Sequence, residues 1–290
     1  MKHSHDYGYK YLFSNKRIFY QLITSFVHEN FVREIDIDDM EVLDKSFISD
    51  EFLSRESDLI YRVQLKESEV YIYILMEFQS TADKSIPVRM LLYELEFYDL
   101  LLRNSQKGKL PSVFPLLLYN GPANWTIPVN ISDLINKHIP SRFIPSFEYY
   151  IIIEKDISDK VLLKLNNLIA AVIYLEKRKD EEGLRKAIDQ VIAMIRQENL
   201  FDIKMFTIWL NHIFRREVNE EVEKIKDITE VKHMLTTIAD QIMEKGVKKG
   251  VKKGVKKGVI HVARNMKNKG MDIKIIAEMT GLTEEEIEKL

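Results

Sequence analysis

The stretch RESDLIYRVQLKESEVYIYILMEFQ, residues 55–79, decides the fold of this chain. Its β-branched, aromatic and aliphatic residues predict two strands, 58–66 and 70–79. The polar break between them predicts a two-residue turn at Glu67-Ser68, which makes the two strands a β-hairpin.

The register of this hairpin would place two acidic residues directly opposite each other. Asp58 would face Glu77 with Cβ atoms about 4.5–5.5 Å apart, and Gln79 would lie on the same side of the sheet. Facing like charges are destabilising unless something neutralises them, and a hard divalent cation is the expected solution. The alternative is an edge hairpin with solvated end charges, because a longer turn or a bulge would shift the register.

Four segments in the first 130 residues occur in the order and spacing of a known family. They are HDYGYKYLF at 5–13, EFQS at 77–80, PVRM at 87–90 with Tyr93, and LYNG at 118–121 followed by Trp125. The set resembles the recombination-promoting nuclease (Rpn) / putative transposase family within the PD-(D/E)XK nuclease superfamily. Gln79 stands where that superfamily usually has lysine.

The resemblance implies an α/β fold with a restriction-endonuclease-like αβββαβ core. We expect the core at 1–155, a helical subdomain at 156–243, a basic Gly-Lys linker at 244–260, and a small helix-turn-helix-like tail at 261–290. The Lys-Gly repeat and the last segment also resemble the usual tail of that family.

The same resemblance assigns roles to individual residues. Asp58, Glu77 and Gln79 are the predicted catalytic residues, and Asp58, Glu77 and the backbone carbonyl of Phe78 would hold Mg²⁺ or Mn²⁺. Five further residues are expected to support the site: His5, Asp6, Lys10, Arg89 and Tyr93. Arg89 and Tyr93 are four residues apart and share a helix face. Arg89 would face a phosphate or, alternatively, pair with a neighbouring acid.

Periodicity predicts the remaining elements. Residues 5–30 carry a helical apolar stripe, with Asp6 as the expected N-cap. Further strands are expected at 42–48, 111–119 and 147–153. Further helices are expected at 87–104, 161–176, 181–197, 201–214 and 217–243.

Seven lysines and no acids lie between 245 and 257, while glycine recurs every fourth residue from Gly246 to Gly258. Glycine disfavours a helix and the like charges repel, so we expect a flexible tether or a helix that forms only on a partner. The DNA phosphate backbone suits six of these lysines, although a linker without specific contacts is the alternative. The six are Lys248, Lys249, Lys252, Lys253, Lys256 and Lys257.

The end of the chain resembles a small helix-turn-helix, with helices at 272–279 and 283–290 around Gly281. Thr283 and Glu286 form a capping box. The second helix begins with three glutamates, which DNA would repel, so a packing or protein-contact role is expected there.

Composition narrows the class of protein. The 290 residues are 46% hydrophobic and 30% charged, with net charge −2 and no cysteine, which excludes disulfides and thiolate metal sites. The absence of an apolar run near 18 residues and of an N-terminal signal pattern predicts a cytoplasmic protein without a membrane segment.

The function expected from these observations is a Mg²⁺-dependent DNA endonuclease of a recombination or mobile-element system. One alternative is a non-catalytic module that binds DNA or protein on a degenerate nuclease fold. Another is a helical scaffold that forms a homo-oligomer. A DDE-type transposase needs three acids in a different arrangement, and the motifs of this sequence do not assign a third.

Overall fold

A computed structural model describes most of the chain: residues 3–43, 59–65, 68–77, 83–104, 108–178, 181–214 and 226–289. Within these ranges the side chains are described except at 3–7, 68–69, 73–77, 181, 214 and 241–257.

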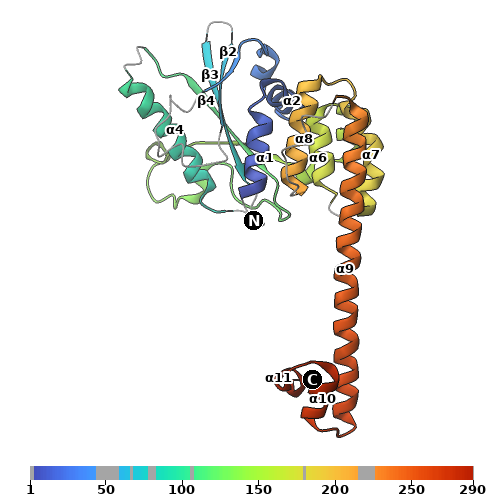
Figure 1. The fold of residues 1–290 in the computed structure, drawn as a ribbon. Coiled ribbons are helices and arrows are strands. Elements are labelled where there is room, and N and C mark those ends of the chain that lie inside the picture. The colour runs from blue at the N-terminus through green and yellow to red at the C-terminus, as the bar shows by residue number, and fades with distance from the viewer. Residues whose placement is uncertain are drawn as a thin grey trace.

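The described strands form one mixed sheet (Figure 1). They are β1 (Met40–Val42), β2 (Leu59–Leu65), β3 (Ser68–Glu77), β4 (Ser112–Tyr119) and β5 (Tyr150–Ile153). Their spatial order follows the chain, with β1, β2 and β3 antiparallel and β3, β4 and β5 parallel. The expected strands 111–119 and 147–153 are therefore present, the second one shorter than predicted.

The predicted hairpin register is wrong by two residues. Leu65 pairs with Ser68, and Leu59 pairs with Ile74 rather than with Met76. Glu69 accordingly pairs with Gln64 rather than with Lys66. A shift of two residues keeps every side chain on the same face, so apolar alternation cannot distinguish the two registers.

Helices cover both faces of this sheet. Tyr61, Ile72 and Leu118 belong to the large hydrophobic core on the side of α1 (His3–Phe13) and α2 (Lys16–Phe26). The opposite face packs against α4 (Ile86–Arg103), as Figure 1 shows. This smaller cluster contains Ile60, Tyr71, Leu117, Met90, Tyr93 and Phe97.

The N-terminal helical stretch is broken, which corrects the expectation of one helix with Asp6 as its cap. Asp6 lies inside α1, because α1 already begins at His3. Asn15 instead caps α2, where its side-chain oxygen accepts the backbone N–H of Arg17 at 2.8 Å. The predicted apolar stripe is confirmed, since Tyr9, Phe19 and their neighbours on it are buried.

A layer of helices packs against α1 and α2. It consists of α5 (Asp159–Leu165), α6 (Leu168–Glu176), α7 (Glu181–Ile195), α8 (Leu200–Phe214) and the first part of α9 (Ile228–Asn268). The expected helix 161–176 is two helices, because Asn166 adopts a left-handed conformation (φ 48°) and Asn167 caps the next helix. Short 3-10 helices occur at Asn30–Glu34, Ile131–Leu134, Ser141–Phe143 and Glu154–Asp156.

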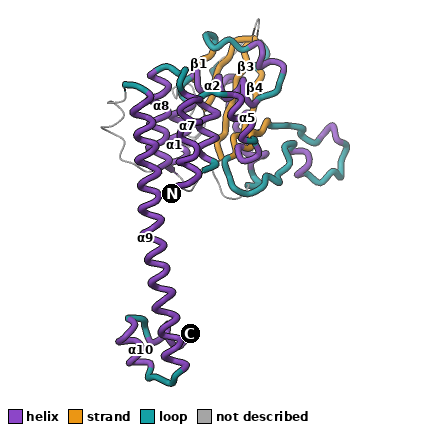
Figure 2. The backbone as a smooth tube through the Cα atoms, turned by 90° about the vertical axis from the view of Figure 1, so that its right-hand side faces the viewer, coloured by secondary structure: helices purple, strands orange, loops and turns teal. Residues whose placement is uncertain are grey.

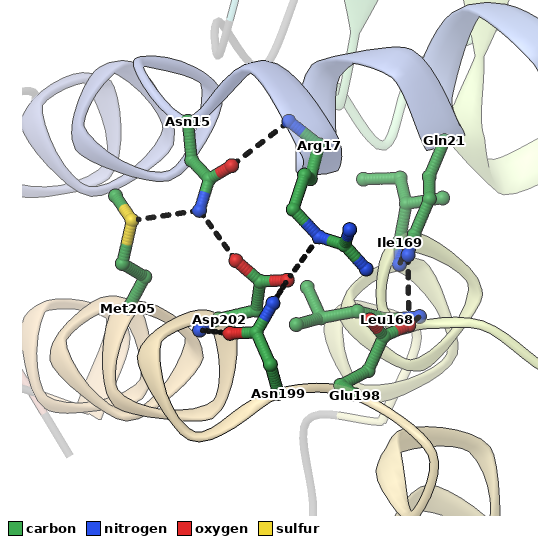
Figure 3. A network of polar contacts seen from close by, with 9 residues as sticks. All are labelled: Asn15, Arg17, Gln21, Leu168, Ile169, Glu198, Asn199, Asp202 and Met205. Carbon is green, nitrogen blue, oxygen red and sulfur yellow. Dashed lines mark hydrogen bonds and ion pairs between the residues drawn. The ribbon is translucent and has the colours of Figure 1, made fainter. Parts of the chain in front are cut away.

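One hydrophobic cluster extends from Tyr9 to Ala239 and joins this layer to the sheet. A buried polar network also crosses the junction (Figure 3). Asp202 of α8 is fully buried and accepts hydrogen bonds from Asn15 Nδ2 at 2.6 Å, Arg17 Nε at 3.0 Å and Asn199 Nδ2 at 2.7 Å. The carboxylate thus links the start of α2 to α8.

The segment 244–260 is helical rather than a flexible tether, and whether the helix needs a partner stays a prediction. The repeat is part of α9, a continuous helix that leads from the body of the molecule to the C-terminal helices (Figure 1). Both ends of α9 are held by packing, through Val231 and Leu235 at one end and Ala263 at the other. Packing at both ends offsets the unfavourable glycines between them. In the described part of the chain, no helix is long and apolar enough to cross a membrane.

The tail follows the predicted pattern. α10 (Ile273–Thr280) and α11 (Glu284–Glu288) flank Gly281, which has a positive φ of 70°. The capping box of Thr283 and Glu286 is confirmed, because each side chain accepts the backbone N–H of the other residue. Lys267 of α9 closes the unit by donating hydrogen bonds to the backbone carbonyls of Ile287 and Glu288.

Candidate functional site

The carboxyl ends of the three parallel strands meet at one edge of the sheet. Glu77, the last residue of β3, lies beside Tyr119 of β4, and Tyr119 lies beside Ile153 of β5. The residues that follow these last two are Asn120 and Glu154. In sheets of this kind, ligands bind outside the carboxyl ends of the strands, so this edge is the candidate site.

Of the predicted catalytic residues, the structure places the backbone of Glu77 at this edge, and its side chain is not described. Asp58, Phe78 and Gln79 lie outside the described residues. The catalytic and metal-binding roles of these four residues therefore remain predictions from the sequence.

The supporting residues on the first helix are placed by backbone. His5 and Asp6 lie in the first turns of α1, with side chains that are not described, and Lys10 is half-buried on the same helix. The six lysines of the repeat lie within α9, again without described side chains.

Arg89 and Tyr93 share a face of α4, as predicted. Arg89 Nε donates to the Tyr93 hydroxyl at 3.0 Å, and Arg89 Nη1 lies 3.3 Å from Asp83 Oδ2. The backbone N–H of Ser85 and the Arg89 guanidinium hold the pKa of Asp83 below its ordinary value. Arg89 thus pairs with a neighbouring acid, as the alternative prediction had it. The ion pair is half-exposed at the start of α4.

A buried polar cluster at the same edge was missed by the sequence interpretation. The Tyr9 hydroxyl donates to Glu154 Oε2 at 3.4 Å, and Asn120 Nδ2 donates to the Tyr9 oxygen at 3.2 Å. Glu154 is only 2% exposed. Burial and, second, the nearby Glu176 carboxylate raise the pKa of Glu154 well above its ordinary value. Burial therefore makes Glu154 hold its proton more tightly than an exposed glutamate does.

Close packing fixes the hydroxyl of this cluster. A Cβ atom at Gly8 would lie 3.3 Å from His212 Cβ and 3.4 Å from Trp209 Cδ1, so the glycine lets α1 approach α8 closely. The Tyr9 ring, next along the chain, meets Trp209 edge-on at 5.9 Å between centroids. This arrangement accounts for two residues of the HDYGYKYLF segment. Gly8 is small where α8 lies close, and Tyr9 supplies the aromatic ring that packs against Trp209.

The sequence did carry a signal for the cluster. Glu154 follows an apolar strand directly, in the same way that Asn120 follows the strand ending at Tyr119. Polar residues just past parallel strands converge at one edge. What the sequence could not show is that the two strands are adjacent. Among the described side chains, no three acids, histidines or cysteines lie together in a way that could hold a metal ion.

Comparison with known proteins gives two family matches. Residues 3–206 match the model described as "Putative transposase, YhgA-like", and residues 256–290 match the C-terminal HTH domain of the Rpn/YhgA-like nuclease family. The helix-turn-helix predicted for the end of the chain is therefore confirmed. No solved structure matches the chain significantly.

Similar proteins occur in Escherichia coli (strain K12). Recombination-promoting nuclease RpnC is 26% identical over 265 residues, which cover 89% of this chain and 87% of that protein. Recombination-promoting nuclease RpnA is 24% identical over 264 residues, with coverages of 87% and 85%. The inactive recombination-promoting nuclease-like protein RpnE is 22% identical over 249 residues, with coverages of 83% and 82%.

Proposed function

We propose that this chain, which belongs to the YhgA-like putative transposase family, is a nuclease that hydrolyses DNA phosphodiester bonds in recombination. The observation that carries the proposal is the likeness to recombination-promoting nucleases RpnC and RpnA over 89% and 87% of the chain. The position of Glu77 at the carboxyl edge of the parallel strands supports it.

Strand alternation supports a site on the face that α4 covers. Ile60 and Tyr71 both pack on that face. Asp58 precedes Ile60 by an even interval, and Glu77 follows Tyr71 by an even interval. In extended strands both acids would therefore fall on the α4 side, one diagonal step apart. The corrected register leaves this expectation intact, because it preserves the face of every residue.

The proposed donor set suits a hard cation. The carboxylates of Asp58 and Glu77 and the carbonyl of Phe78 are oxygen ligands of the kind that Mg²⁺ or Mn²⁺ prefers. When bound, such an ion supplies an activated water and offsets charge on the phosphate. The amide of Gln79 can orient water or a phosphate oxygen by hydrogen bonds, but it lacks the charge of a lysine.

Neighbouring residues would position the substrate and the first helix. The guanidinium of Arg89 is oriented by Tyr93 and Asp83 on the α4 face, where it can meet a phosphate. The Tyr9–Glu154 contact holds α1 at the strand ends, and α1 carries His5 and Asp6. We propose positioning roles for these residues rather than contact with the reacting atoms.

The lysine repeat would bind the DNA backbone. Along a helix, a step of four residues advances about 40° past a full turn, so positions 248, 252 and 256 follow a slowly winding line. A cationic line of this kind suits phosphates without reading sequence. The C-terminal HTH domain is a second candidate for DNA contact, although the three glutamates at the start of α11 argue against a groove-reading role for that helix.

A second candidate function is a DNA-binding module without nuclease activity. Gln79 in place of lysine and the inactive relative RpnE favour it. This function predicts salt-sensitive DNA binding that depends on residues 245–258 and no metal-dependent cleavage.

The proposal is tested with supercoiled plasmid and Mg²⁺. Wild type should nick or linearise the plasmid, and Asp58→Ala and Glu77→Ala should each abolish this activity. Glu69→Ala is the matched control, because Glu69 is an acid at the opposite end of β3, paired with Gln64. Undiminished cleavage by both Asp58→Ala and Glu77→Ala would refute the proposed site.

A further inference from the structure

The connection between β4 and β5 carries an exposed tip with an unusual composition. All eight residues from Asn136 to Phe143 are exposed, and we call this segment the tip. Two large apolar side chains in it are mostly in solvent, Ile139 at 57% and Phe143 at 62% exposure. Figure 2 shows the loops and short 3-10 helices of this connection projecting from the sheet, away from α9.

The base of the connection is anchored, so the tip is held in place. Asn130 forms an antiparallel bridge with Glu148, and the Tyr149 hydroxyl donates to the carbonyl of Pro128 at 3.2 Å. Ile131 and Tyr149 are buried, and Tyr149 belongs to the cluster that packs α4 on the sheet. The exposed apolar residues are therefore presented by a packed base.

The tip itself is ordered by local contacts. The Phe143 N–H donates to the Pro140 carbonyl at 3.0 Å, within the 3-10 helix Ser141–Phe143. The Arg142 guanidinium lies over the Phe143 ring, 4.7 Å from its centroid. The ring and the guanidinium are thus presented together, which lowers the entropy cost of binding.

The charge of this region is one-sided. Between Leu134 and Phe147 the chain contains Lys137, His138 and Arg142 and no acid, although the whole chain has a net charge of −2. Lys137 pairs with Asp133 at the base, at 3.2 Å. No ion pair joins Arg142 to a carboxylate in the part of the chain that the structure describes. An exposed cation beside apolar side chains fits a polyanion that also offers an apolar surface.

We propose that the tip is a contact surface for double-stranded DNA, with Arg142 on a phosphate and Phe143 and Ile139 as an apolar wedge against base pairs. Apolar side chains flanked by cations are used in this way by proteins that deform the duplex. The inference rests on the proposed nuclease function, because the connection starts directly after the carboxyl end of β4, beside Glu77. DNA held at that edge would pass close to the base of the connection.

Binding of an end-labelled 30-base-pair duplex to the full chain, measured by fluorescence anisotropy in EDTA, tests the proposal. Phe143→Ala should weaken binding roughly tenfold, as loss of an aromatic contact with a base does. Arg142→Gln should reduce the slope of log K against log salt by about 0.9, the value for one phosphate contact.

Two matched controls are exposed residues elsewhere. Phe201→Ala removes another phenylalanine, 66% exposed on α8, and Arg103→Gln removes an exposed arginine of α4 that pairs with Asp99. Both should bind DNA within twofold of wild type. The proposal is overturned if Phe143→Ala binds the duplex as tightly as the wild type, or if the wild type does not bind the duplex.

Three further outcomes separate this inference from the alternatives. If vesicles containing anionic lipid bind the protein through Phe143 while DNA binding does not depend on it, the tip is a membrane contact and the proposal is wrong. If the wild type binds duplex through Phe143 but cuts no DNA in Mg²⁺, the nuclease function fails and the contact surface stands. If the wild type cuts DNA and Phe143→Ala binds duplex as tightly as the wild type, the nuclease function stands and the contact surface fails.

Discussion

Replacing Asp202 with alanine should destabilise the protein by about 3 kcal/mol. The fully buried carboxylate accepts hydrogen bonds from three side chains (Figure 3). Loss of the acceptor leaves the buried Asn15 amide with only the weak sulfur acceptor of Met205, at 3.3 Å, which costs about 1–3 kcal/mol. Asn199 is exposed and water can replace its partner, so about 0.5–1.5 kcal/mol is lost there. Arg17 is 54% exposed, and its ion pair contributes about 0–1 kcal/mol.

Thermal unfolding followed by circular dichroism measures this effect. A loss of 3 kcal/mol should lower the Tm by about 6–12 °C for a protein of this size. Asp189→Ala is the matched control, because Asp189 is 80% exposed and its ion pair with Lys232 contributes at most about 1 kcal/mol. In an Asn15→Ala background the cost of Asp202→Ala should fall by about 1–2 kcal/mol. Equal Tm shifts for Asp202→Ala and Asp189→Ala would refute the reasoning.

Three other predictions concern the edge and the tail. Because the pKa of Glu154 is raised, the folded state binds the proton more tightly, and stability falls as pH rises above 4.5. Glu154→Gln should therefore raise the Tm at pH 8 and not at pH 4. An equal change of Tm at both pH values would contradict this. Gln79→Lys should increase the rate of plasmid cleavage by adding a positive charge, and a slower rate would exclude an electrostatic role at this position. Changing all six repeat lysines to glutamine should reduce the slope of log K against log salt for DNA by about 5, whereas an unchanged slope would place the contacts elsewhere.

Much of the fold followed from apolar patterning. The strands 112–119 and 150–153 were predictable because they are short apolar runs bounded by proline, glycine or polar residues. The start of α4 was predictable from Pro87, and the cap of α11 from Thr283 and Glu286. These features depend on residues that are close together in the sequence, so the sequence alone is enough to predict them.

The wrong predictions concern features that depend on contacts between residues far apart in the sequence. The hairpin register could not be chosen from alternation, because registers that differ by two residues bury the same side chains. Asn15, at the break between α1 and α2, is bonded to Asp202, which lies far away in the sequence. The repeat in α9 was expected to be flexible because glycine disfavours a helix. The packing that stabilises this helix is at Val231 and Ala263, which lie outside the repeat.

The candidate site was predictable only in part. Arg89 and Tyr93 were paired correctly from their spacing of four residues. Glu154 was missed because it and its partners, Tyr9 and Asn120, come from three different segments that only the sheet order brings together. The roles of Asp58 and Gln79 stay predictions, since both lie outside the described residues.

The rate at which the protein nicks supercoiled plasmid in Mg²⁺, compared between wild type and Glu77→Gln at equal DNA occupancy, tests the nuclease proposal most directly. Occupancy is set from duplex binding in EDTA, so that a loss of rate reports chemistry rather than affinity. The proposal predicts that Glu77→Gln binds DNA as wild type does and cuts at least roughly 100-fold more slowly. Equal rates for the two proteins would contradict a catalytic role for the strand end that carries Glu77.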